Sequence, residues 1–223
     1  MKYFLAVLMI LGISSCRTIT PLPHSVVSDP TLRGKCVVAG VPPLFRAVHT
    51  ITATIRGRSS AFIGVTIADI PADRIRATLL SVEGMVLMDA VDNQGRITLY
   101  QALPPFDSVP FAQGLFRDIR FLFFPEHGKL VRVQTGPKNA VACTWFDNDR
   151  AVERTSDASG EAVIREYDTK NDHVLRRVEL FPPVQGGFYK RIRMTSSGVS
   201  SYSLSFDLLE AEPLGREDGL FSR

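Results

Sequence analysis

Apolar and polar residues alternate along most of the chain after residue 48, and this period-two pattern predicts β-strands. In the first such segment, residues 49–55, Ile51, Ala53 and Ile55 alternate with threonines. Strands are likewise predicted at residues 61–68, 74–82, 85–91, 96–100, 130–134, 140–146, 150–155, 162–167, 174–181, 188–195 and 201–210. Many of the connections are short turns, such as residues 92–95, so neighbouring strands are expected to be antiparallel.

One segment interrupts the strands with a helical period. Phe111, Leu115, Ile119 and Phe123 recur at four-residue steps, which predicts a helix with an apolar stripe over residues 108–123. Residues 41–48 fit either a short second helix or an extended lead-in to the first strand. The pattern therefore predicts a mainly β, antiparallel fold with one or two helices, in which something apolar must cover the helical stripe.

The N-terminus has the order of features of a bacterial lipoprotein signal. Lys2 supplies a positive charge, residues 3–11 form an uncharged apolar run, and small residues precede Cys16. The run is shorter than the roughly 20 residues of a membrane-spanning helix. Residues 13–16 resemble a lipobox, so residues 1–15 are interpreted as a signal peptide and Cys16 as the lipid-modified start of the mature chain. The alternatives are an ordinary secretory signal with a chance cysteine and a buried N-terminal helix.

A lipidated Cys16 would anchor the chain to a membrane, because two or more acyl chains, such as palmitate, make a stable anchor. Arg17 stands where inner-membrane lipoproteins of Gram-negative bacteria commonly carry aspartate, which favours the outer membrane, facing the periplasm. Prolines disfavour regular structure in residues 16–40, which are expected to form a tether. A single domain at residues 41–212 and a loose tail at residues 213–223 complete the predicted organisation.

Charge and cysteine content narrow the classes of function. The formal net charge of +3 falls to +2 when residues 1–15, with Lys2, are removed, and no nucleic-acid partner is expected of so neutral a chain. Cys36 and Cys143 would both lie outside the cytoplasm, where disulfides persist. A bridge between them and two buried free thiols are equally consistent with the sequence.

Groups that carry catalysis or bind metals are sparse. The four histidines have no second histidine or cysteine at the usual ligand spacing, and no nucleophile elbow or phosphate-binding loop occurs. No metal, cofactor or enzymatic activity is predicted, and the alternative is a hydrolase with an unfamiliar site. The basic run at residues 190–193 fits either a surface facing anionic lipid headgroups or an ordinary solvated strand face.

Apolar residues are the more informative feature. A strongly curved sheet covered by a helix either encloses a cavity for an apolar ligand or fills its interior with side chains, and the sequence fits both. The residues expected to face inward, as the lining of such a cavity, are Phe62, Leu79, Leu87, Leu99, Phe111, Leu115, Phe188 and Phe206.

The layout of these segments resembles the lipoprotein-localisation superfamily of LolA and LolB. The matching features are the lipobox, the strand meander at residues 49–100, the helical segment at 107–115 and the closing strands at 190–195 and 202–206. The resemblance implies an incomplete, strongly curved antiparallel β-barrel with a helical lid and an apolar cavity for acyl chains. The long loop with an exposed leucine that LolB carries is not found, and Ile70 is the nearest substitute.

These features predict a membrane-anchored lipoprotein that binds lipid or lipoprotein acyl chains in an apolar cavity, in lipoprotein or lipid transport to the outer membrane. Its expected partners are the membrane, reached through the lipid anchor, and a lipid or an acylated lipoprotein. The alternative is a structural or interaction lipoprotein with a filled core, whose partner is a protein of an envelope complex.

Overall fold

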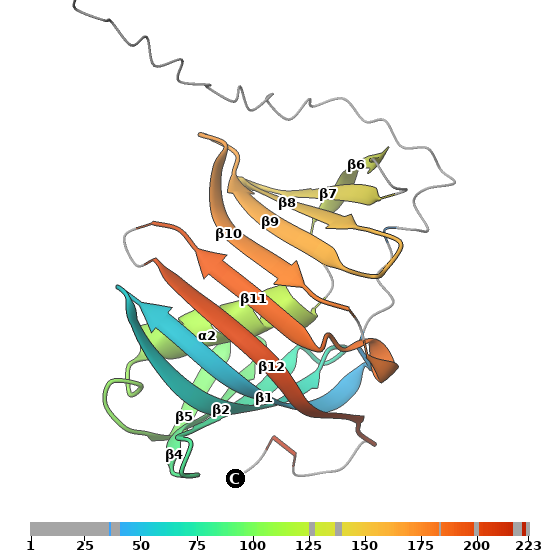
Figure 1. Ribbon diagram of the computed structural model, residues 1–223. Coiled ribbons are helices and arrows are strands. Elements are labelled where there is room, and N and C mark those ends of the chain that lie inside the picture. The colour runs from blue at the N-terminus through green and yellow to red at the C-terminus, as the bar shows by residue number, and fades with distance from the viewer. Residues whose placement is uncertain are drawn as a thin grey trace, which may run out of the picture.

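The computed structural model describes residue 36 and residues 41–124, 128–136, 140–182, 184–198, 201–215 and 220–221. The predicted signal peptide, Cys16 and nearly all of the predicted tether lie outside these residues. Within them, twelve strands form one sheet (Figure 1). The strands are β1 (Leu44–Ile55), β2 (Arg58–Asp69), β3 (Arg74–Leu80), β4 (Val86–Asn93), β5 (Arg96–Ala102), β6 (Lys129–Thr135), β7 (Val141–Asp147), β8 (Arg150–Ser156), β9 (Ala162–Asp168), β10 (His173–Leu180), β11 (Arg191–Ser196) and β12 (Tyr202–Pro213).

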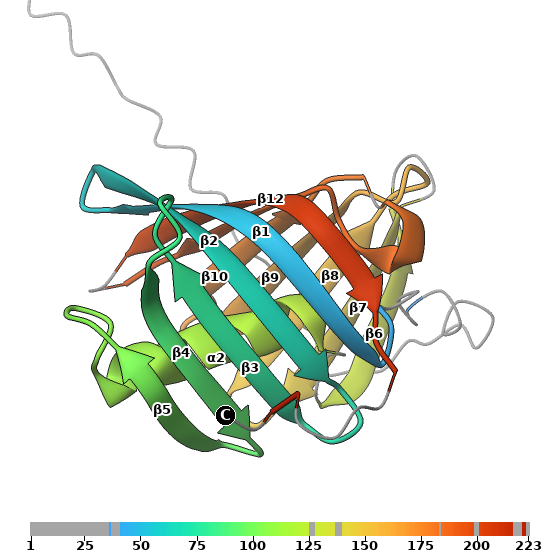
Figure 2. The same cartoon turned by 90° about the horizontal axis from the view of Figure 1, so that it is seen from below.

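The sheet is antiparallel throughout and has the order β5-β4-β3-β2-β1-β12-β11-β10-β9-β8-β7-β6. The last strand, β12, lies between β1 and β11 and so joins two meanders into one sheet. The sheet curves strongly around the helix (Figure 2). Its two edges, β5 and β6, are not paired with each other in the described part of the chain. The predicted incomplete, strongly curved barrel is confirmed.

Side-chain alternation gives the sheet an apolar inner face and a polar outer face. On β1, Phe45 and Ala47 are completely buried on the inner face, whereas Arg46 points outward and pairs with Glu210 and Glu212 of β12 at 3.1 and 3.3 Å. The strand begins at Leu44, so the extended alternative for residues 41–48 is the observed one.

Two strand boundaries at the C-terminal end differ from the prediction. The predicted strand 188–195 starts only at Arg191, because the short 3-10 turn η3 (Gln185–Gly187) precedes it and Gly186 takes a positive φ of 84° there. The last strand runs on to Pro213, where it pairs with Phe45.

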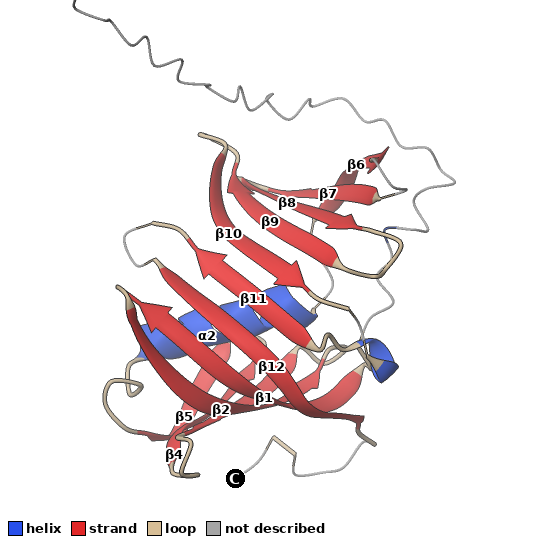
Figure 3. Ribbon diagram, in the orientation of Figure 1, coloured by secondary structure: helices blue, strands red, loops and turns tan. Residues whose placement is uncertain are grey.

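The helix α2 (Val109–Phe123) lies against the inner face of the sheet (Figure 3). Ser108 caps its N-terminus by accepting a hydrogen bond from the Phe111 amide at 3.3 Å. Ile119 of the predicted stripe is buried together with Ala112 and Phe116, and the other stripe residues, Phe111, Leu115 and Phe123, are half-buried. Each four-residue step turns about 40° around a helix, so the ends of a long stripe of this kind drift to its flanks.

A disulfide joins Cys36 to Cys143 on β7, with a Cα–Cα distance of 5.8 Å across a sequence separation of 107 residues. Of the two alternatives that the sequence left open, the structure has the bridge and not two free thiols. Both cysteines pack with Val133, Val141 and Trp145 in a small buried cluster at the β6 edge. Cys36 is the one residue of the predicted tether that the structure describes, and the bridge attaches it to the second meander of the sheet.

Candidate functional site

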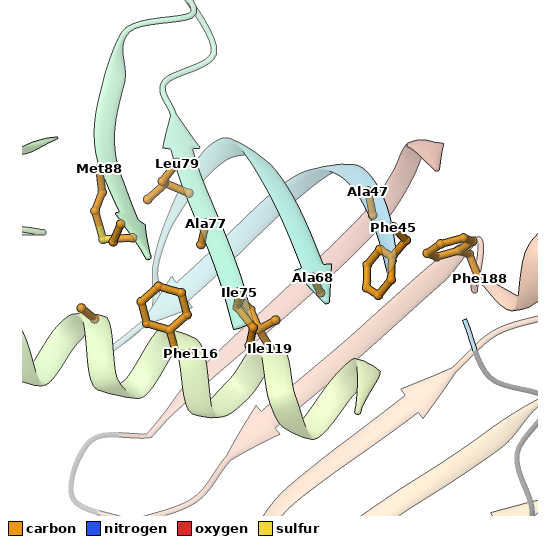
Figure 4. Close-up of a cluster of buried hydrophobic side chains, with 12 residues drawn as sticks. Phe45, Ala47, Ala68, Ile75, Ala77, Leu79, Met88, Phe116, Ile119 and Phe188 are labelled. Carbon is orange, nitrogen blue, oxygen red and sulfur yellow. The ribbon is translucent and has the colours of Figure 1, made fainter. Parts of the chain in front are cut away.

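The space between α2 and the first meander is filled by an inner cluster of apolar side chains. Figure 4 shows Ile75, Ala77 and Leu79 of β3 on the side of the sheet that faces Phe116 and Ile119 of α2. Alanines on the strands let the helix approach the sheet closely. The members of the inner cluster are Phe45, Ala47, Ala68, Ile75, Ala77, Leu79, Met88, Ala90, Ala112, Phe116, Ile119 and Phe188.

Three phenylalanine rings form an aromatic margin beside the inner cluster. Phe62 of β2 contacts Phe106 edge-on at a centroid distance of 5.7 Å, and Phe106 contacts Phe111 of α2 at 5.2 Å. All three rings pack against the inner cluster but are only half-buried. Apolar surface therefore remains accessible where the N-terminal end of α2 meets the sheet.

The eight predicted lining residues fall into three groups. Phe206 belongs to a second buried cluster, with Ile192 and Met194 of β11. Leu87 is half-buried at an irregularity of the β3–β4 pairing and is not among the described side chains that pack in or against the inner cluster. The other six belong to the inner cluster or pack against it. Leu79 and Phe188 are buried, and Phe62, Leu99, Phe111 and Leu115 are half-buried.

A buried charge cluster, Asp118, Glu166 and Arg176, fixes one flank of α2. Arg176 of β10 donates to Asp118 of α2 at 2.9 Å and to Glu166 of β9 at 2.6 Å. The Tyr202 hydroxyl donates to the other carboxylate oxygen of Asp118. Arg176 also lies 4.6 Å from the ring centroid of Phe121 on α2. These contacts join the helix to three strands at once.

Burial affects the two acids of this cluster differently. It raises the pKa of Asp118 above its ordinary value, although Tyr202 and Arg176 oppose the shift. Burial also acts on Glu166, but there the positive charges of Arg176 and Arg150 outweigh it and lower the pKa. Glu166 therefore remains the firmly ionised partner of Arg176, and the charge on Asp118 depends on its contact with Arg176 and Tyr202.

Arg120 fixes the opposite flank of α2. It donates to Asp92 of β4 and, at 3.0 Å, to Asp73 in the β2–β3 connection. Residues two apart point about 200° apart around a helix, so Asp118 and Arg120 reach toward opposite sides of the curved sheet. Sequence reasoning did not identify either residue, although an aspartate between Phe116 and Ile119 of an apolar helix was a usable signal.

The C-terminal ends of β1, β3 and β5 and the start of α2 lie at one end of the barrel (Figure 2), and five exposed apolar residues belong to these segments or to the turns that follow them. Val82 and Met85 in the β3–β4 turn are 59% and 57% exposed. Ile70 lies at the other end and is half-buried against the inner cluster. We call the exposed set the apolar rim; its members are Ile55, Val82, Met85, Leu103 and Val109.

Other kinds of site were sought among the described residues. No helix there is long and apolar enough to cross a membrane, and no group of three or more His, Cys, Asp or Glu side chains is placed to hold a metal ion. The apolar inner face, the aromatic margin and the apolar rim are the features that point toward an apolar ligand.

Comparison with known proteins defines the fold. No family model matches the sequence, and no curated protein matches it either. The structure is similar to the LolA superfamily protein NE2245 from Nitrosomonas europaea, with a TM-score of 0.57 and 11% identity over 88% of this chain and 98% of that one. A DUF1329 family protein from Desulfovibrio piger gives a TM-score of 0.46 and 10% identity over 86% and 95%. The likeness to NE2245 shows that the chain has a LolA/LolB-like fold.

Proposed function

We propose that this protein is a membrane-anchored lipoprotein that binds lipid, or the acyl chains of a lipoprotein, between α2 and the inner face of the sheet. The observation that carries the proposal is the form of that contact: one helix covers an apolar, strongly curved sheet face and is fixed at its flanks by ion pairs. The LolA/LolB-like fold supports a role in lipoprotein or lipid transport to the outer membrane. No enzymatic activity is assigned.

Ligand binding requires α2 to move, because the inner cluster fills the space beneath it. An acyl chain would replace the contacts of Phe116 and Ile119 with the strands, and each buried methylene contributes about 0.8 kcal/mol. The ligand must bind the opened form more tightly than the closed one, since only this difference shifts the population. The half-buried rings of the aromatic margin, Phe62, Phe106 and Phe111, offer the first apolar contact.

The proposed contact with a membrane rests on two features of the chain, Cys16 and the apolar rim. Cys16 would carry the lipid anchor, and the tether after it would give the domain reach from the bilayer. The apolar rim would then contact the bilayer at the end of the barrel where the aromatic margin is accessible, so that an acyl chain passes from membrane to inner face with little exposure to water.

The test is native mass spectrometry of the mature chain, residues 16–223, carrying Cys16→Ser and purified without detergent. A stoichiometric added mass that dissociates as a lipid or an acylated peptide is expected. Leu115→Asp, at a half-buried position of α2, should remove that mass. Gln113→Asp introduces the same charge at an exposed position of the same helix and should retain it.

One observation favours a second candidate function, a structural or interaction lipoprotein that docks on an envelope protein. Phe45, Phe116 and Phe188 are almost completely buried, as in an ordinary packed core. A bare protein mass that stays unchanged after incubation with envelope lipids would refute lipid binding and favour this candidate.

A further inference from the structure

A groove of about 340 Å³, lined by charged, hydroxyl and apolar residues, crosses the outer face of the sheet over β1, β12, β11 and β10. It forms because Ile192 and Met194 of β11 are buried on the inner face, so Arg193 and Thr195 point outward. Short hydroxyl side chains flank them and leave the surface hollow. The hydroxyl residues of the groove are Thr52, Thr54, Thr195, Ser203 and Ser205.

Two arginines line this groove and differ in their partners. Arg177 forms an ion pair with Glu179: Nη2 of Arg177 donates to Oε1 of Glu179 at 2.8 Å. Arg193 forms no ion pair with any acidic side chain of the described residues. Its guanidinium lies 4.9 Å from the ring centroid of Phe181, a residue that lines the adjoining groove, so Arg193 stands at the boundary between the two grooves. Arg193 is thus a cation without an acidic partner among the described residues, at the edge of the hydroxyl-lined groove.

The net charge of the residues that line each groove indicates whether an anion or a cation would bind there. Arg177 and Arg193 against Glu179 give the groove a net charge of +1. An adjoining groove of about 390 Å³ shares Arg193 and Glu179 but adds Asp157 and Glu161, so its ionisable lining has a net charge of −2. An anion therefore belongs on the hydroxyl side of Arg193 and not in the adjoining groove.

We propose that the hydroxyl-lined groove binds a phosphoryl group, with Arg193 as its principal donor. Guanidinium and hydroxyl donors together match phosphoryl oxygens, and the volume falls in the range of about 300–1,000 Å³ that small-ligand sites occupy. The phosphate belongs either to a phospholipid headgroup or to a soluble phosphate ester. This site is on the opposite face of the sheet from α2 and does not depend on binding of acyl chains beneath the helix.

The neighbouring Arg191 provides a matched control. It lies on the same strand and the same outer face as Arg193, but its Nε donates to Asp207 at 2.6 Å and it does not line the groove. Replacing either arginine by glutamine removes one exposed positive charge from β11. If binding depends only on positive surface charge, the two variants should lose phosphate binding equally. If the groove is a specific site, only Arg193→Gln should lose it.

The experiment titrates the ¹⁵N-labelled mature chain carrying Cys16→Ser with inorganic phosphate and with glycerol 3-phosphate, and sediments it with vesicles of phosphatidylglycerol and phosphatidylcholine. Saturable shifts at Thr195 and Ser205, or vesicle binding, should weaken about tenfold or more in Arg193→Gln and persist in Arg191→Gln. Binding of the soluble phosphates alone identifies a phosphate ester, and binding to the vesicles identifies a headgroup.

Three outcomes would overturn the proposal: no binding in either arm, equal loss in the two variants, or equal shifts with chloride at the same ionic strength. The native mass spectrum separates this proposal from the proposed function. Arg193→Gln should keep the lipid mass that Leu115→Asp removes, so each proposal can fail without the other.

Discussion

The carboxylate of Asp118 on α2 and the guanidinium of Arg176 on β10 lie 2.9 Å apart, with side chains only 8% and 6% exposed. This pair connects the one helix over the sheet to the second meander, whereas the inner cluster connects it to the first. Any opening of α2 must separate these charges or carry them together into water. The pair therefore contributes to how firmly the helix is held over the apolar face.

Removing the buried cation should destabilise the fold strongly. Arg176→Leu leaves Asp118 and Glu166 without their shared partner, and breaking a buried pair in this way costs about 3–5 kcal/mol. Arg177→Leu, the next residue, removes an exposed arginine and should cost no more than about 1 kcal/mol. Urea unfolding of both variants at pH 7.5 measures the difference. Equal losses of stability would show that the buried cluster has no special role.

A buried histidine should make stability depend on pH. His49 of β1 packs near Phe123 and Phe206, and burial lowers its pKa to about 4, against the opposing charge of Asp207. Between pH 4 and 6.5 the unfolded chain binds the proton that the folded chain excludes, so stability falls as the pH falls through this window.

The size of this effect can be measured against a variant that lacks the titrating group. Wild type should lose about 2 kcal/mol more than His49→Phe between pH 7.5 and pH 5, as measured by urea unfolding at each pH. Other titrating groups contribute to both proteins and cancel in the comparison. An identical pH dependence in the two proteins would mean that His49 is protonated equally in the folded and unfolded states.

The disulfide should contribute measurably to stability. Its two cysteines are separated by 107 residues, and closing a loop of this size restricts the unfolded chain. Replacing both Cys36 and Cys143 by alanine should lower the free energy of unfolding by about 2–5 kcal/mol under non-reducing conditions. Dithiothreitol should produce a similar loss in the wild type and none in the variant. A wild type that is insensitive to the reductant contradicts the bridge.

The apolar rim should mediate contact with a bilayer. Val82→Asp with Met85→Asp should weaken sedimentation of the unlipidated mature chain with phosphatidylethanolamine–phosphatidylglycerol vesicles by about tenfold, because two exposed apolar contacts are replaced by charges. Val184→Asp with Leu209→Asp makes the same change at exposed apolar positions outside the rim and should leave binding unchanged. Equal weakening by the two pairs would assign the effect to net charge.

Local pattern alone identified most of the fold. Period-two alternation located the twelve strands, and the four-residue recurrence of Phe111, Leu115, Ile119 and Phe123 located α2. These patterns depend on neighbours in sequence, since side chains alternate along a strand and residues four apart lie on one face of a helix. The boundaries that differed, at Leu44, Arg191 and Pro213, depend on the pairing of β1 with β2 and β12 and on the turn before β11.

The site was decided by contacts between residues far apart in the chain. The sequence placed Leu79, Phe111 and Leu115 on inward faces, but alternation does not reveal whether helix and sheet meet tightly or leave a space. Asp118 meets Arg176 across 58 residues, and Arg191 pairs with Asp207 whereas Arg193, two residues along the same strand, lies over the ring of Phe181. The sequence by itself determined which residues face inward along the regular strands and the helix, because that follows from local geometry, but not at the irregularity that holds Leu87. Only the tertiary structure decided what they meet there, because packing and charge pairing depend on how the curved sheet brings distant strands and α2 together.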